Sequence, residues 1–148
     1  MRVFIGAVDD NEQRLIKSIE RYCQGMIDIN ILRGGNIGAK KFAVPDFCVG
    51  EGRAVYIDSN YVLNADLQEL FDLIPKDGID IHPALAYRTE VMMFDCSKKT
   101  CFTYDCNQNA PDTAFVQYYM EKKVICFGRW PEWNRDRLTD DAKLYRGG

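Results

Sequence analysis

Short apolar runs alternate with amphipathic segments along this chain. The runs that match a buried strand in length and composition are residues 2–8, 27–32, 54–58, 91–95 and 124–127. Apolar residues at helical spacing predict helices that follow Asp10, follow Asp66 and span residues 113–121. Strands that alternate with helices favour an α/β fold with an open, mostly parallel mixed sheet flanked by helices. From the length of 148 residues we expect a single domain over residues 1–148.

Acidic residues at two predicted helix starts have the spacing of capping boxes. Asp10 is followed three residues later by Gln13, and Asp66 is followed at the same distance by Glu69. Residues 39–48 place apolar side chains at helical spacing around a proline, which a helix interior resists. We therefore expect a short or broken helix there. The tail from Trp130 has no clear periodicity, and we expect it to be irregular.

Composition and charge exclude several classes of partner. The chain has 19 Lys and Arg against 22 Asp and Glu, so it lacks the basic excess that nucleic-acid binding requires. No apolar stretch approaches the roughly 18 residues of a transmembrane helix. The N-terminus does not resemble a signal peptide, so we expect a cytoplasmic protein. The six cysteines have no CxxC spacing and there is one histidine, which favours reduced, mostly buried thiols over a zinc site.

Three acids lie at or just past the ends of predicted strands: Asp9, Asp58 and Asp95. In open α/β sheets, ligands bind outside the carboxyl ends of the strands. We therefore expect the three carboxylates to face one crevice. The alternative for Asp9 and Asp95 is that they cap turns, because Asp is favoured in turns in any case.

The segment at residues 52–72 resembles the core of GT-A type nucleotide-sugar glycosyltransferases, most closely those of family eight. It contains a strand, an Asp-x-Asp-like turn at Asp58 and Asn60, and a helix that ends in Leu-Phe-Asp. Three further segments match the family in the same order: residues 41–45, 91–96 and 130–134. The resemblance implies a GT-A-like domain. It also implies transfer of a sugar from a nucleoside-diphosphate sugar, expected to be a UDP-sugar, to a glycan, protein or lipid acceptor.

The resemblance also implies roles for individual residues. Asp58 and Asn60 would hold Mn²⁺ or Mg²⁺ weakly, because an amide oxygen ligates without adding negative charge. Asp95 stands where the family has Asn, and it would contact a sugar hydroxyl or act as a base. The other positions implied in nucleotide or sugar binding are Ala7, Val8, Asp9, Lys41, Ser59, Arg88 and Arg146.

The tail departs from the family pattern. Family-eight enzymes place a metal-binding histidine before a glycine late in the catalytic domain, whereas here Arg146 precedes Gly147. A guanidinium at this position would place a permanent positive charge on the diphosphate. The alternative is a frayed terminus.

Two other functions stay open at this point. A non-catalytic relative that binds a nucleotide sugar is favoured by Asn60 and by the missing histidine. An unrelated α/β domain, such as a nucleotidyltransferase or a flavodoxin-like protein, is the other alternative. No GxGxxG motif or P-loop follows a predicted strand, which disfavours dinucleotide and NTPase functions.

Overall fold

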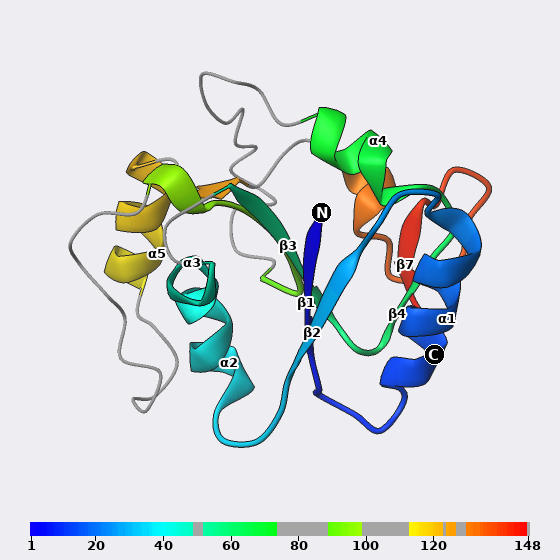
Figure 1. Cartoon of the computed structure of the whole chain (residues 1–148), viewed down its shortest axis with the longest axis horizontal. Coiled ribbons are helices and arrows are strands. Elements are labelled where there is room, and N and C mark those ends of the chain that lie inside the picture. Colours follow the sequence, from blue (N-terminus) through cyan, green and yellow to red (C-terminus); the bar gives the residue numbers. More distant parts are fainter. Residues whose placement is uncertain (49–51, 74–88, 99–112, 123, 127–129, 148) are drawn as a thin grey trace.

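A five-stranded mixed sheet lies at the centre of the computed structural model, which describes residues 1–48, 52–73, 89–98, 113–122, 124–126 and 130–147 (Figure 1). In spatial order its strands are β2 (Asp28–Leu32), β1 (Arg2–Gly6), β3 (Arg53–Asp58), β5 (Val91–Asp95) and β6 (Ile125–Cys126). β1 pairs in parallel with both β2 and β3, whereas β5 is antiparallel to β3 and to β6. All strands except β5 therefore run in one direction, which confirms the predicted α/β fold and mostly parallel sheet.

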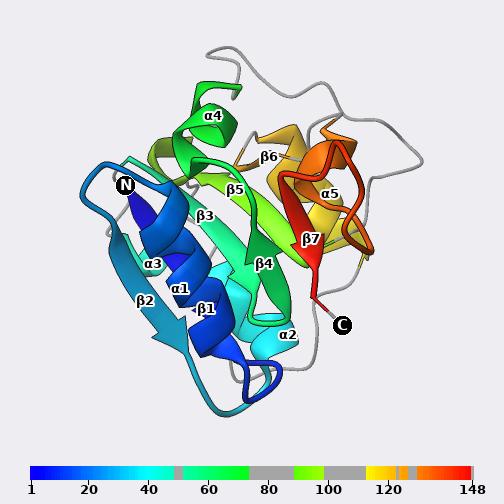
Figure 2. The same cartoon turned by 90° about the vertical axis from the view of Figure 1, so that its right-hand side faces the viewer.

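A second, two-stranded sheet joins the tail to the middle of the chain. Its antiparallel strands are β4 (Tyr61–Leu63) and β7 (Leu144–Arg146), and they lie side by side in Figure 2. The prediction of an irregular tail is therefore wrong for residues 144–146. This strand is short, and its pairing partner is remote in sequence, so local periodicity carries no signal for it.

Helices cover both faces of the central sheet (Figure 1). The α-helices are α1 (Glu12–Tyr22), α2 (Ile37–Lys40), α3 (Val44–Phe47), α4 (Leu67–Asp72) and α5 (Thr113–Glu121). The 3₁₀ turns are η1 (Lys41–Ala43), η3 (Cys96–Lys98) and η4 (Pro131–Trp133). α2, α3 and α5 lie on one side of the sheet, and α1, α4 and the small sheet lie on the other. The succession α2, η1 and α3 confirms the predicted broken helix.

Alternate residues of the central strands enter two separate cores. On β3, Ala54 and Tyr56 join the cluster on the side of α2, α3 and α5. Val55 and Ile57 join the cluster on the side of α1, α4 and β4. Because both faces are covered, the strands show nearly continuous apolar runs rather than a polar–apolar alternation.

The start of α4 follows the sequence prediction in part. Asp66 is the N-cap residue, and its Oδ1 accepts a hydrogen bond of 3.0 Å from the backbone N–H of Gln68. The capping box does not close, because the Glu69 carboxylate pairs with Lys143 at 3.1 Å instead. The cap therefore rests on one side chain, while Glu69 links α4 to the chain just before β7.

The start of α1 differs from the prediction. The helix begins at Glu12, and the N-cap residue Asn11 makes no side-chain cap hydrogen bond. The predicted capping box of Asp10 and Gln13 is therefore wrong. Asp9 supports this turn instead, because its Oδ1 accepts a hydrogen bond of 3.0 Å from the backbone N–H of Asn11.

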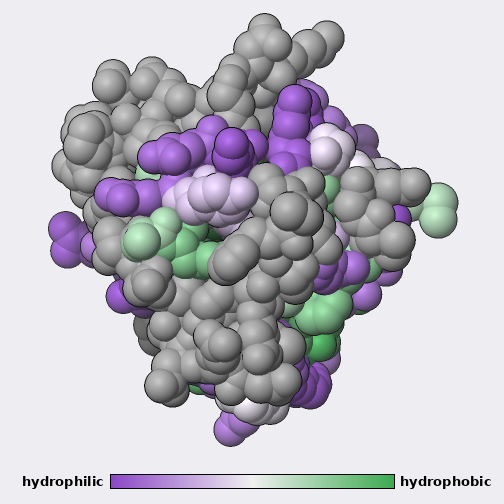
Figure 3. Space-filling model, turned by 90° about the vertical axis from the view of Figure 1, so that its left-hand side faces the viewer, coloured by the Kyte–Doolittle hydropathy of each residue, from purple (hydrophilic) through white to green (hydrophobic). Residues whose placement is uncertain are grey.

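Three of the six cysteines have side chains that the structure describes, and these agree with the prediction of reduced, mostly buried thiols. Cys48 and Cys96 are buried free thiols, and Cys23 is a partly buried one, whereas the side chains of Cys101, Cys106 and Cys126 lie outside the described part. Figure 3 shows polar residues gathered in a band over one face, with apolar residues in smaller groups. Within the described part of the chain, no helix has the length and apolar character needed to cross a bilayer.

Ser18 supplies a buried hydrogen-bond link between α1 and β4. Its hydroxyl donates to Leu15 O at 2.7 Å and accepts from the Leu63 N–H at 2.9 Å. We predict that Ser18→Ala lowers the free energy of unfolding by about 1–3 kcal/mol, because the Leu63 N–H loses its partner. Urea denaturation measures this loss. Thr139→Ala, which removes an exposed hydrogen bond to Asp141, is the control and should cost clearly less.

Candidate functional site

The carboxyl ends of β1 and β3 meet at one edge of the sheet, where Gly6 is the register partner of Asp58. The fully buried Ser59 joins the loops that follow the two strands. Its hydroxyl donates to Asp9 Oδ1 at 2.8 Å and accepts from the N–H groups of Val8 and Asp9 at 3.1 and 3.2 Å. Asp9 and Asp58 therefore follow neighbouring strands at one edge, and Asp9 also caps the turn at Asn11, which is the alternative predicted for it. The Ser59 hydroxyl holds the 7–9 loop in place.

Asp58 is a carboxylate with only 9% of its surface exposed. Its Oδ1 accepts a hydrogen bond of 2.5 Å from the Tyr56 hydroxyl, and its N–H donates to Glu90 O at 2.9 Å. Burial raises the pKa of Asp58, and the Tyr56 hydrogen bond and the charge of Lys41 oppose that rise. The Asp58 carboxylate is thus largely removed from water, so its negative charge needs hydrogen-bond donors or cations as partners.

Lys41, in η1, is one of those partners. Its ammonium donates to the carbonyl and hydroxyl oxygens of Thr89 at 3.0 and 2.8 Å, and it lies 5.4 Å from the centre of the Tyr56 ring. Burial lowers the pKa of Lys41, while the negative charges of Asp58 and Glu90 raise it. A buried ammonium therefore lies next to the buried carboxylate.

Arg146 reaches the same region from β7. Its Nη2 lies 3.6 Å from Glu90 Oε1, and its Cζ lies 5.9 Å from the centre of the Tyr61 ring. Its positive charge also opposes the rise in the pKa of Asp58. The N–H of Gly147 donates to Asn60 O at 2.8 Å, which ties the tail to the turn after β3. The alternative of a frayed terminus is wrong for these residues.

Among the described residues at this edge, two buried acceptor atoms have no hydrogen-bond partner: Oδ1 of Asn60 and Oε2 of Glu90. Such atoms are uncommon in folded proteins, because an unpaired buried acceptor is costly. Among the residues that the structure describes, no group of three or more His, Cys, Asp and Glu side chains is placed to hold a metal. The oxygen set predicted to hold a metal is therefore small: it consists of Asp58 and Asn60, whose role as ligands stays a prediction.

Asp95 does not belong to this edge. β5 is antiparallel to β3, so Asp95 is the register partner of Arg53, at the opposite end of the strand from Asp58. At about 3.3 Å per residue the two acids are on the order of 17 Å apart along the strand. Asp95 Oδ1 accepts from the N–H and hydroxyl of Ser97 at 3.2 and 2.5 Å, which is a turn cap. The expectation that Asp95 shares a crevice with Asp58 is therefore wrong. Its implied role as a base or as a contact to a sugar hydroxyl stays a prediction.

Three predicted nucleotide- or sugar-binding positions remain, and two of them lie at the edge that holds Asp58. Ala7 and Val8 follow β1 at the same edge as Asp58; Ala7 donates its N–H to Leu32 O at 2.9 Å, and Val8 is 48% exposed. Arg88 lies outside the described residues. The loop after β1 is thus an accessible surface beside the buried charges.

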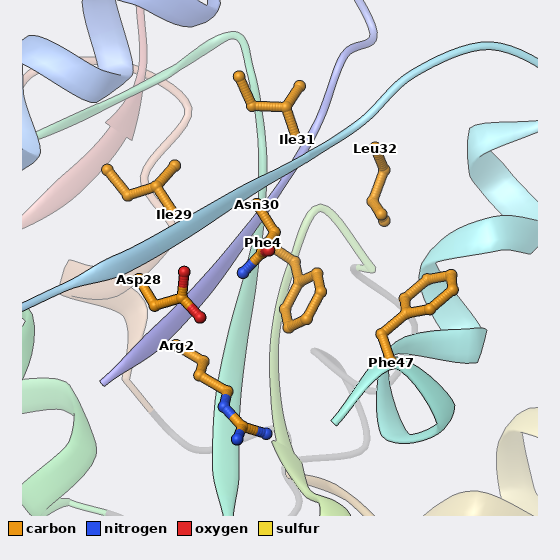
Figure 4. A pocket seen from close by; sticks show the side chains of 8 residues that line it. All are labelled: Arg2, Phe4, Asp28, Ile29, Asn30, Ile31, Leu32 and Phe47. Atoms are coloured by element: carbon orange, nitrogen blue, oxygen red, sulfur yellow. The ribbon is translucent and has the colours of Figure 1, made fainter. Parts of the chain in front are cut away.

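A separate groove of about 580 Å³ runs along the edge strand β2 (Figure 4). Its walls include Arg2, Phe4 and Asp28, together with Phe47 of α3. The rings of Phe4 and Phe47 stack with their centres 6.0 Å apart. Asp58 and its neighbours do not line this groove, so it is not part of the candidate site.

Tyr56 was not predicted as a site residue from the sequence. It has one signal, since it lies two residues before Asp58 and therefore on the same side of the strand. Glu90 directly precedes the segment that matches the family, at a position where the resemblance implies contacts to the donor sugar, but its place beside Asp58 depends on β5 running antiparallel to β3.

Comparison with known proteins bears on the fold. No protein-family model matches the sequence, and no curated protein matches it. Among solved structures, that of an active-site mutant of LgtC, a GT-A glycosyltransferase, is similar, with a TM-score of 0.58. The match covers 99% of this chain and 87% of the LgtC chain at 14% sequence identity. The chain therefore has a GT-A-like glycosyltransferase fold.

The buried Asp58 carboxylate predicts a pH dependence of stability. Its pKa is higher in the folded state, so the folded state binds the extra proton and stability falls as the pH rises from about 4, the unfolded value, through the folded value. Asp58→Asn lacks this titration, and we predict that wild type loses stability relative to the variant over that window. Urea denaturation at a series of pH values checks this, and parallel curves would contradict it.

Asp141 provides a control of opposite sign. Hydrogen bonds from Thr139 and Arg135 lower the pKa of Asp141, so its contribution is present above the unfolded value and is lost as the pH falls towards the folded value. Asp141→Asn should therefore become less stable relative to wild type as the pH rises through the range below about 4.

Proposed function

We propose that this protein is a glycosyltransferase that takes a sugar from a nucleoside-diphosphate sugar, with a UDP-sugar as the donor. The observation that carries the proposal is the convergence of Asp58, Lys41 and Arg146 at one edge of a GT-A-like sheet. These three residues come from β3, η1 and β7, and they lie beside the loop of residues 7–9. In open α/β sheets such an edge is where ligands bind.

The charges at this edge suit a diphosphate leaving group. When the bond between the sugar and the diphosphate breaks, negative charge develops on the diphosphate and must be neutralised. Arg146 carries a permanent charge in a planar fork that matches phosphate oxygens, and it is partly exposed. Lys41 adds a second cation whose desolvation strengthens its field. We assign leaving-group stabilisation to this pair.

The oxygen atoms at this edge fit a weakly held divalent cation. Asn60 Oδ1 is a buried acceptor without a partner among the described residues, and Asp58, two residues earlier in the sequence, supplies one carboxylate. Mg²⁺ and Mn²⁺ commonly take one or two carboxylates and complete their shell with water and substrate phosphates. Asp58 and Asn60 would hold the ion, and the ion would supply Lewis-acid charge to the diphosphate.

The binding surfaces for the nucleoside and for the acceptor have weaker support than the diphosphate site. Ala7, Val8 and Asp9 form the loop beside Asp58, and we propose that this loop contacts the nucleoside. The acceptor, which we expect to be a glycan, protein or lipid, has no assigned surface. The small oxygen set favours a second candidate function, a non-catalytic relative that binds the nucleotide sugar. Slow donor hydrolysis without an acceptor would support the enzyme, and its absence, with binding intact, would support the binding protein.

A thermal-shift panel tests the proposed donor. We predict that UDP or a UDP-sugar with Mn²⁺ raises the melting temperature more than NAD or ATP does. All of these ligands carry linked phosphates, so the difference would come from the uridine and from the terminal diphosphate that the proposed donor site takes. At a hundredfold excess over Kd the stabilisation is about 2.7 kcal/mol. Asp58→Ala should abolish the part of the melting-temperature shift that depends on Mn²⁺, and Asn60→Asp should increase that part. An equal or larger shift with NAD would contradict the proposal.

Arg146→Ala tests the role of β7 in diphosphate binding. We predict that UDP affinity falls by about 1.5–3 kcal/mol, the value of a hydrogen bond to a charged group, while uridine affinity changes far less. Isothermal titration measures both. The matched control is Arg137→Ala, which removes the same charge from an exposed position in the same tail. A similar loss in both variants would indicate a general charge effect rather than a contact of Arg146.

A further inference from the structure

A fixed hydrogen bond orients the Asp58 carboxylate from within the core. Tyr56 and Asp58 are two residues apart on β3, so their side chains leave the strand on the same side. The Tyr56 side chain is fully buried, and its hydroxyl donates to Asp58 Oδ1 at 2.5 Å. The hydrogen bond therefore runs from the buried middle of the strand to the residue at its end.

The neighbouring strand leaves room for this hydroxyl at one point. Gly6 lies beside Asp58 in the register of β1 and β3. A Cβ atom at Gly6 would lie 1.9 Å from the Tyr56 hydroxyl oxygen and 2.9 Å from Cγ2 of Ile37. The hydroxyl thus fills the space that any other residue at position 6 would occupy. Glycine at the end of β1 is a condition for this orientation of Tyr56.

Lys41 contacts the Tyr56 ring and restricts it further. Its ammonium lies 5.4 Å from the centre of the Tyr56 ring and is held by two hydrogen bonds to Thr89. A cation over an aromatic face is attracted to it, which further restricts the ring. The ring, its hydroxyl and one oxygen of Asp58 therefore form one rigid unit.

We propose that Tyr56 is a positioning residue for the candidate site: its hydroxyl holds Oδ1 of Asp58, so that a divalent cation meets the carboxylate through Oδ2. This inference rests on the proposed function. A carboxylate with one oxygen fixed cannot rotate away from a bound ion, and its charge does not have to be reoriented when the ion and the diphosphate arrive. On this proposal, Tyr56 itself contacts neither the ion nor the diphosphate.

The test measures the binding of Mn²⁺ rather than turnover. Free Mn²⁺ is followed by electron paramagnetic resonance as it is titrated into protein saturated with UDP. We expect Tyr56→Phe, which keeps the ring and removes the hydroxyl, to weaken Mn²⁺ binding roughly 10- to 100-fold, as loss of a hydrogen bond to a metal ligand commonly does. UDP affinity without metal should stay at the wild-type value.

Two further variants separate positioning from a general loss of stability. Ser18→Ala also removes a buried hydroxyl with two hydrogen bonds, but far from Asp58 in the sequence and on the side of α1. It should keep wild-type Mn²⁺ affinity. In an Asp58→Asn background, Tyr56→Phe should cause no further loss, because the hydroxyl acts through the Asp58 carboxylate.

Each outcome decides the inference. Wild-type Mn²⁺ affinity in Tyr56→Phe, or an equal loss in Ser18→Ala, overturns the role of Tyr56 while leaving the proposed function intact. A further loss from Tyr56→Phe in the Asp58→Asn background also overturns it, because the hydroxyl would then act by another route. If the wild-type protein binds neither UDP nor Mn²⁺, the proposed function fails and the inference fails with it.

Discussion

A buried carboxylate at the end of the central strand is the constraint on which the rest of this site depends. Removing the charge of Asp58 from water is costly, and it is tolerated only where partners replace the lost hydration. The partners come from three parts of the chain: the Tyr56 hydroxyl within β3, the Lys41 ammonium from η1, and the Arg146 guanidinium from β7. The broken helix and the tail strand both bring a cation to the end of β3.

The apolar pattern predicted the strands because it reports burial on both faces, but it contains no information on strand direction. Residues 54–58 and 91–95 have the same kind of apolar run ending in an acid, and both were placed correctly in the sheet. Their acids differ in place because β5 is antiparallel to β3, so Asp95 meets Arg53 while Glu90 meets Asp58. The edge that holds Asp58 therefore receives Glu90, the residue that precedes the second run, which no rule based on strand ends could select.

The tail shows a second limit of local sequence signals. Residues 144–146 pair with a strand some eighty positions earlier and have no periodicity of their own, so only their pairing with β4 defines them as a strand. The resemblance to family eight nevertheless identified Arg146 as a candidate, because it compared positions along a whole domain rather than within one window. Asp10 shows the reverse case, because its sequence matches a capping box that the structure does not form. Instead, the Asp9 carboxylate accepts a hydrogen bond from the Asn11 N–H. The Ser59 hydroxyl, in the loop after β3, donates to the same carboxylate.

The balance of charge at this edge bears on how a nucleotide would bind. Lys41 and Arg146 face Asp58 and Glu90, so the two cations are already opposed by two carboxylates before any ligand arrives. On the proposed function, a diphosphate alone would add negative charge to a site that has no excess of positive charge. A diphosphate that carries a divalent cation adds far less net charge. On that proposal the ion would use the Asp58 carboxylate and the Asn60 oxygen, and Arg146 would pair with phosphate oxygens. The paired charges at this edge would therefore favour binding of metal and nucleotide together over binding of either one alone.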